Sequence, residues 1–204
     1  MTKTDKTVSL LVLGTLTPVC FLLLFWWGSI PFVEERLVPV MALLGLLAGA
    51  ALDCTLLRRF VFRLFSLPVP ALAALGACYS VLVYGFFMGF PVFNSLVGIA
   101  GGTIAARACV LQGLTEEETN KRLREINLFF LGLLFVLCVC SAILALNEPT
   151  IGLQIKGMFS LPFDVTFGMV WALILLGGAL LLVFQYFCAS RIARCVLKKA
   201  GRRP

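Results

Sequence analysis

The sequence predicts an all-α protein, a polytopic bundle of six transmembrane helices with the N-terminus and the C-terminus both in the cytoplasm. Of its 204 residues, 61% are hydrophobic and 13% are charged, and the mean hydropathy is +1.04. A soluble domain of this size needs a charged surface, which 17 basic and 10 acidic residues are too few to form. The composition likewise excludes a disordered chain, a nucleic-acid-binding module and a secreted disulfide scaffold.

Six apolar runs, each about as long as one membrane crossing, follow one another and form a single membrane domain, 1–204. The predicted spans are residues 8–30, 38–57, 69–90, 92–111, 126–146 and 165–187. Between the third and the fourth there is almost no polar break, so we place the turn at Gly89-Phe90-Pro91, with Pro91 or Asn94 opening the fourth helix. Because the fourth run is the least apolar, five spans are the structural alternative.

Basic residues predict the orientation of the spans. With the N-terminus inside, 15 of the 17 lysines and arginines fall in inner segments, and only Arg36 and Lys156 fall outside. The first run is too long for a signal peptide, and Trp26 and Trp27 stand where a cleavage site needs small residues, so we expect a retained helix. We therefore expect a multi-pass protein of the cell membrane, in a prokaryotic inner membrane.

Two segments are expected to extend into the cytoplasm. Thr115 and Glu118 fit a capping box, and no helix-breaking residue follows, so residues 116–125 should be a helical extension of the fifth span. The tail, 188–204, is a basic helix that should favour anionic lipid. Its basic residues at helical spacing are Arg191, Arg194 and Lys198. Alternatively, 114–125 and the tail dock a membrane or cytoplasmic protein subunit.

Ionisable side chains inside the hydrocarbon are costly, and two qualify. Asp53 and Arg107 each lie about 22 Å below the outer surface, roughly 8 Å inside the inner edge of the core. We predict that they pair and join the second span to the fourth. The alternative is that both reach the cytoplasmic interface, to pair with a neighbour such as Arg58 or with lipid phosphate. Asn94 is the third candidate residue of this buried polar or substrate-binding site.

Small residues recur every four positions on both of these spans, which permits close helix packing. Gly45 and Gly49 precede Asp53 on the second span, and the face of the fourth span precedes Arg107. We expect these two faces to meet, either as a polar site or as ordinary tight packing. The residues of the fourth-span face are Gly98, Gly102 and Ala106.

The sequence contains few of the residue patterns that enzymes use for catalysis or metal binding. We therefore expect no enzyme, no cofactor and no metal site. The sequence has no histidine, and its eight cysteines form no CxxC pair. Residues 102–107 superficially resemble the GxxAR portion of CDP-alcohol phosphotransferases. That family needs aspartates around the motif to hold its metal ions, and none are near it here, so we reject the resemblance.

The outer segment from Asn147 to Asp164 is the other candidate site. It contains Glu148 and Lys156 among apolar residues, and it is either a lid over a cavity that opens outward or a plain connection. Asp164 is expected to be the N-cap of the sixth span.

Two functions follow from these patterns. The first is a small-molecule transporter, or the substrate-binding membrane subunit of one, with a cavity near 147–164 for an apolar or aromatic ligand. Six spans in about 200 residues are similar in size and topology to the substrate-binding subunits of energy-coupling-factor vitamin importers, although no diagnostic motif of that family is present. The second is a non-catalytic structural or assembly subunit of a membrane complex.

Overall fold

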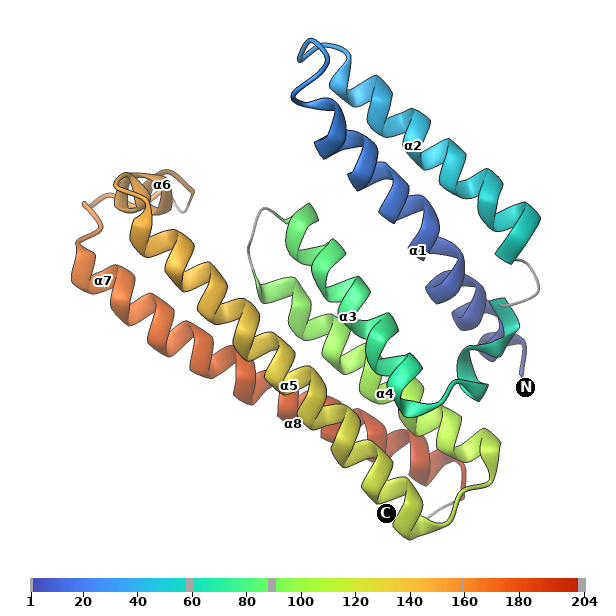
Figure 1. Ribbon diagram of the computed structural model, residues 1–204. Coiled ribbons are helices and arrows are strands. Elements are labelled where there is room, and N and C mark those ends of the chain that lie inside the picture. Colours follow the sequence, from blue (N-terminus) through green and yellow to red (C-terminus); the bar gives the residue numbers. More distant parts are fainter. Residues whose placement is uncertain (1, 58–60, 88–90, 159, 202–204) are drawn as a thin grey trace.

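The protein is entirely helical in the part of the chain that its computed structural model describes, residues 2–57, 61–87, 91–158 and 160–201 (Figure 1). Within these ranges six stretches are long and apolar enough to cross a membrane, and they follow the six predicted runs in order. Gly89 and Phe90 of the predicted turn lie outside the described residues. So do four of the basic residues counted for the orientation, Arg58, Arg59, Arg202 and Arg203.

Six long helices and six short ones make up the described part of the chain. The long helices are α1 (Lys3–Ser29), α2 (Val38–Leu52), α3 (Val69–Phe86), α4 (Asn94–Gln112), α5 (Glu116–Asn147) and α8 (Gly178–Lys199). A π-helix, η1 (Asp53–Leu57), continues α2, while α7 (Phe167–Ala172) and a second π-helix, η4 (Leu173–Gly177), lead into α8. The connections contain the 3₁₀ helices η2 (Val61–Ser66) and η3 (Pro91–Phe93) and the short helix α6 (Ile151–Met158).

Local sequence signals place the ends of α4 and α5. Gly113 ends α4 in the left-handed conformation, with φ of 69°, which a glycine adopts without strain. The predicted capping box of Thr115 and Glu118 is confirmed, and α5 continues without a break to Asn147. The same device, which the sequence analysis missed, starts α1, where Thr2 and Asp5 cap each other's backbone.

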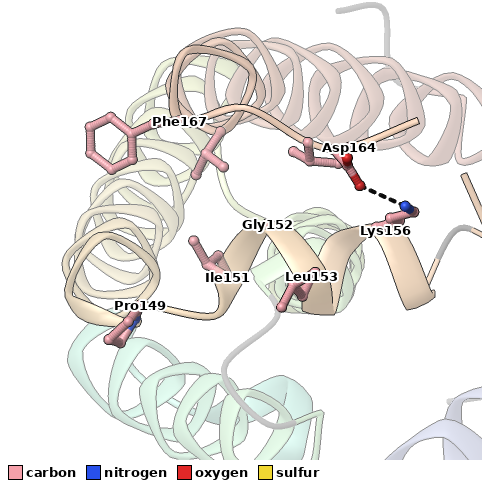
Figure 2. A pocket seen from close by; sticks show the side chains of 9 residues that line it. Pro149, Ile151, Gly152, Leu153, Lys156, Asp164 and Phe167 are labelled. Atoms are coloured by element: carbon pink, nitrogen blue, oxygen red, sulfur yellow. Dashed lines mark hydrogen bonds and ion pairs between the residues drawn. The ribbon is translucent and has the colours of Figure 1, made fainter.

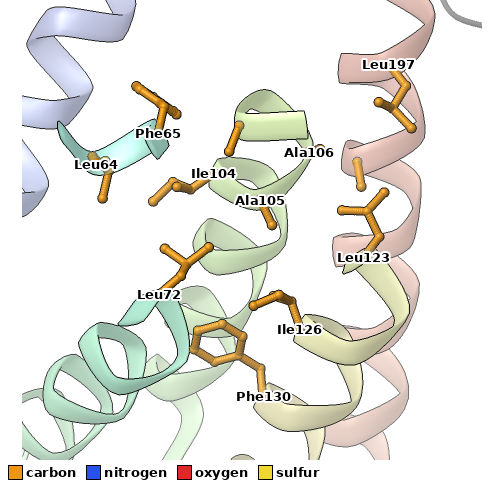
Figure 3. Packing of buried hydrophobic residues seen from close by; sticks show 12 residues of the cluster. Leu64, Phe65, Leu72, Ile104, Ala105, Ala106, Leu123, Ile126, Phe130 and Leu197 are labelled. Atoms are coloured by element: carbon orange, nitrogen blue, oxygen red, sulfur yellow. The ribbon is translucent and has the colours of Figure 1, made fainter. Parts of the chain in front are cut away.

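Helix α4 is the centre of the molecule. It packs against α3, α5 and α8, and 56% of its span is buried, whereas the other five spans are 6 to 17% buried. Figure 3 shows the buried cluster where η2, α3 and α5 meet α4. Its largest members are Leu64, Phe65, Leu72, Ile104, Leu123, Ile126, Phe130 and Leu197.

Helices α1 and α2 form an antiparallel hairpin that meets the other long helices through α1 (Figure 1). The Tyr79 hydroxyl of α3 donates to the carbonyl of Val12 and is 2.9 Å from the hydroxyl of Thr15. Both chain termini lie at the same end of the long helices, the lower end in Figure 1, which we call the terminal end. The short helix α6 lies at the opposite end, which we call the α6 end.

Candidate functional site

The predicted pairing of Arg107 with Asp53 is wrong, because Arg107 binds Asp5. Its Nε and Nη2 donate to the two carboxylate oxygens of Asp5 at 2.8 and 2.9 Å. The first turn of α1 brings Asp5 to α4, and the carboxylate is almost fully buried there. A bidentate pair of this kind satisfies both groups and fixes their relative orientation.

The glycine face of α2 packs on α1 and not on α4, which corrects the second part of the prediction. A Cβ at Gly45 would lie 2.4 Å from the Phe21 carbonyl oxygen, and one at Gly49 would lie 2.6 Å from Cα of Pro18. Both approaches are closer than a side chain allows, so the two glycines set the spacing of the hairpin.

Asp53 follows on the same face of α2, one turn beyond Gly49. A Cβ at Gly14 of α1 would lie 3.8 Å from its Oδ2 atom, so the carboxylate also faces α1. Both carboxylate oxygens are buried, and neither has a hydrogen-bond partner among the described residues. Such a group inside a candidate span is costly and calls for an explanation.

The glycine face of α4 contacts α5 and α8. A Cβ at Gly98 would lie 2.5 Å from the side-chain amide of Gln185, and one at Gly102 would lie 2.9 Å from Oδ1 of Asn127. Gln185 is only 2% exposed, and its Oε1 and the Asn127 Oδ1 have no hydrogen-bond partner in the described structure. Ala106 is completely buried on the same helix.

Gln185 and Asn127 were missed by the sequence analysis, which considered only ionisable groups inside the spans. An amide within an apolar run was the available signal. Asn94 is also buried, but its amide donates to the Ser80 carbonyl of α3 at 3.1 Å, so it holds α3 against α4. It is not brought into contact with Asp53 or Arg107 by any hydrogen bond or ion pair of the described residues.

At the terminal end, hydrogen bonds of polar side chains join α4 and α5 to the segment that leads into α3. Arg122 of α5 donates to the Gln112 side chain at 2.6 Å and to the Leu67 carbonyl at 2.7 Å. Gln112, at the end of α4, donates in turn to the Phe65 carbonyl at 2.6 Å. Arg122 is therefore part of the internal packing, whereas Lys121 and Arg124 beside it are exposed.

Helix α6 and the start of α7 line a half-open pocket of about 260 Å³ (Figure 2). Gly152 makes this fold possible, because a Cβ there would lie 2.7 Å from the Val165 carbonyl oxygen. The lining residues are Pro149, Ile151, Gly152, Leu153, Lys156, Asp164, Val165, Phe167 and Val170. The lining is thus mostly apolar, with one charged pair.

That pair joins Lys156 to Asp164, with Nζ 2.6 Å from Oδ1. The hydrogen bond from Lys156 holds the pKa of the Asp164 carboxyl below its ordinary value. Asp164 is therefore not the N-cap of the last span, since Thr166 caps α7 through the backbone N–H of Met169. Glu148 accepts hydrogen bonds from the hydroxyl and backbone N–H of Thr150, which lower its pKa.

The basic face of α8 lies opposite a buried face. Ala189, Ala193 and Leu197 are buried, while Arg191, Arg194 and Lys198 are exposed. Arg191 lies over the Phe187 ring, with 5.0 Å between the guanidinium carbon and the ring centroid.

Comparison with known proteins identifies no relative of this chain. No family model, curated protein sequence or solved structure matches the chain.

Proposed function

We propose that the protein is a small-molecule transporter, or the substrate-binding membrane subunit of one, and that its substrate first binds in the pocket between α6 and the start of α7. One observation carries this proposal: α6 and the start of α7 line a pocket of about 260 Å³. Six apolar helices are compatible with an integral membrane protein, and a pocket at one end of the long helices suits the entry site of a transporter.

The lining indicates the chemistry of the substrate. Ile151, Leu153 and Phe167 offer apolar and aromatic surface, and the Lys156–Asp164 pair offers one cationic and one anionic group at the side of the pocket. A small, mainly apolar or aromatic molecule with one polar or charged group matches this surface.

Native mass spectrometry of the protein in its own lipids tests the proposal. We expect a small molecule to remain bound to the wild-type protein in stoichiometric amount. Gly152→Ala should remove it, because the new Cβ collides with the Val165 carbonyl and lifts α6. Gly157→Ala is the matched control in the same helix, since nothing lies within 4 Å of its Cβ position.

Retention of the same molecule by both variants would place its site elsewhere. A phospholipid as the bound species, or no bound molecule in the wild type, would contradict the proposal.

A separate observation supports the alternative function, an assembly subunit of a membrane complex. In the segment 114–125 the side chains of Glu116, Glu117, Lys121 and Arg124 are exposed, beside the exposed basic face of α8. Together these two surfaces would form a charged platform for a protein subunit. Co-purification of one stoichiometric protein, lost on Lys121→Glu and Arg124→Glu, would favour this second function.

A further inference from the structure

Asp53 stands at a defect in α2. The α-helix ends at Leu52, and Asp53 begins the π-helix η1, although both belong to the candidate span Val38–Thr55. π-helical turns are rare in proteins and occur frequently at functional sites. From Val38, Asp53 lies about 22 Å along the helix axis, well within a hydrocarbon core of about 30 Å.

Among the described residues, no cation or hydrogen-bond donor balances the charge of the Asp53 carboxylate. Both oxygens are buried and unpartnered among the described residues, and Arg107, the cation at a similar depth, is bound to Asp5 through both of its carboxylate oxygens. An ionised carboxylate without a donor or a counter-ion is strongly disfavoured at low dielectric.

The turn of α1 that faces Asp53 contains a second defect. Pro18 lies inside α1 and has no N–H, so it donates nothing to the carbonyl of Gly14, four residues earlier. Gly14 is also the residue whose Cβ position lies 3.8 Å from Oδ2 of Asp53. The Asp53 carboxylate therefore faces the turn of α1 in which the Gly14 carbonyl has no proline N–H to accept.

The titratable surroundings are sparse. Helix α2 has no ionisable side chain, and α1 has Lys3, Asp5, Lys6 and Cys20. On α3, the Tyr79 hydroxyl contacts Val12 and Thr15 of α1. No group of three histidine, cysteine or acidic residues that could hold a metal ion comes together in the described structure.

We propose that the α1–α2 hairpin binds a small monovalent cation, H⁺ or Na⁺, between the Asp53 carboxylate and the Gly14 carbonyl. The cation neutralises the carboxylate, and the freed carbonyl accepts its hydrogen bond or coordinates it. If the protein is a transporter, this cation is its coupling ion. That last clause rests on the proposed function, whereas cation binding itself does not.

Thermal unfolding of the full-length protein in lipid nanodiscs tests cation binding. Titration with NaCl, balanced by choline chloride at each pH, should raise the Tm by about 5 °C at a hundredfold excess over Kd if the ion is Na⁺. If the ion is H⁺, the Tm should be independent of Na⁺. The infrared spectrum should then contain a protonated-carboxyl band that Asp53→Asn removes and Asp164→Asn does not.

Pro18→Ala provides the matched variant on α1. It returns an N–H to the Gly14 carbonyl, so it should keep the fold and weaken the Na⁺ effect on Tm, or shift the carboxyl band. If Asp53 had only a structural role, Pro18→Ala would change neither the Na⁺ effect on Tm nor the carboxyl band.

The proposal is overturned if wild-type protein shows neither a Na⁺-dependent Tm nor the carboxyl band. Failure of the transport proposal looks different: no small molecule would be found by mass spectrometry, while one of the two cation signatures would remain.

Discussion

The ion pair of Arg107 and Asp5 joins residues 102 positions apart in the chain. Because Asp5 is buried while Arg107 remains partly exposed, removal of either partner leaves the other without its charge-assisted bonds. We expect Asp5→Asn and Arg107→Gln each to lower stability, with a coupling free energy of about 1–3 kcal/mol in a double-mutant cycle. Thermal unfolding in detergent measures it.

The same cycle with Asp53→Asn in place of Asp5→Asn is the control. Asp53 and Arg107 are not paired, so these two changes should add within about 0.5 kcal/mol. Strong coupling of Asp53 to Arg107, together with additivity for Asp5, would contradict the pairing described here.

Phe130 illustrates how glycines determine packing at a single residue. Its ring would lie 2.2 Å from a Cβ at Gly76 of α3 and 2.2 Å from a Cβ at Gly101 of α4, so the ring occupies the space that both glycines leave. Gly76→Ala and Gly101→Ala should each destabilise the protein by about 1–3 kcal/mol in chemical denaturation. Gly132→Ala on α5, with open space around it, should be neutral or slightly stabilising.

Individual residues show which features of the site the sequence predicts and which it does not. Asp53 and Gly49 share a face because they lie one turn apart, which the spacing predicts correctly. Arg107 was assigned the wrong partner because equal depth does not fix a neighbour, and Asp5 was counted outside the apolar run. The Thr2–Asp5 spacing, typical of a helix start, is the overlooked signal that Asp5 belongs to the first helix.

At the scale of one element, the Lys156–Asp164 pair links α6 to the segment before α7. Because the folded state lowers the pKa of Asp164, the pair stabilises the closed α6 above the carboxyl's ordinary value of 3.8 and is lost as the pH falls further. Hydrogen exchange in α6, corrected for the intrinsic rate, should therefore be unchanged from pH 7 to 5 and increase at more acidic pH. Asp164→Asn should exchange fast throughout.

Helix α8 is the second element with a prediction of its own. We propose that its exposed arginines bind anionic lipid headgroups. Arg191→Gln with Arg194→Gln should weaken binding of phosphatidylglycerol by about 2 kcal/mol, or roughly 30-fold, in native mass spectrometry. Lys121→Gln with Arg124→Gln, which removes the same charge from α5, should have a smaller effect. Equal losses would indicate general electrostatic attraction only.

Elements differ in how well the sequence predicts them. Helix ends follow from local chemistry, as Thr115, Glu118 and Gly113 demonstrate. Lateral neighbours do not, since lipid-facing and protein-facing surfaces are both apolar and a glycine face fits any helix that is close enough. The face of Gly45 and Gly49 therefore predicted tight packing correctly and its partner incorrectly.

On the scale of the whole molecule, the two proposed sites lie toward opposite ends of the long helices. The pocket lies at the α6 end, and the Asp53 site lies in the hairpin toward the terminal end, where η1 is located (Figure 1). The charge asymmetry predicts that the α6 end faces outward, so that a substrate and a coupling ion would approach from different depths of the same membrane. The transport proposal requires this orientation and six crossings, whereas cation binding at Asp53 requires neither.

Site-directed labelling in intact cells tests this requirement most directly. In a background without the native cysteines, Lys156→Cys and Lys121→Cys are each exposed to a membrane-impermeant maleimide. The account predicts rapid labelling at position 156 from outside, and labelling at position 121 only after the cells are permeabilised. Labelling of position 121 from outside would contradict the orientation, and labelling of both positions from one side would contradict the six crossings.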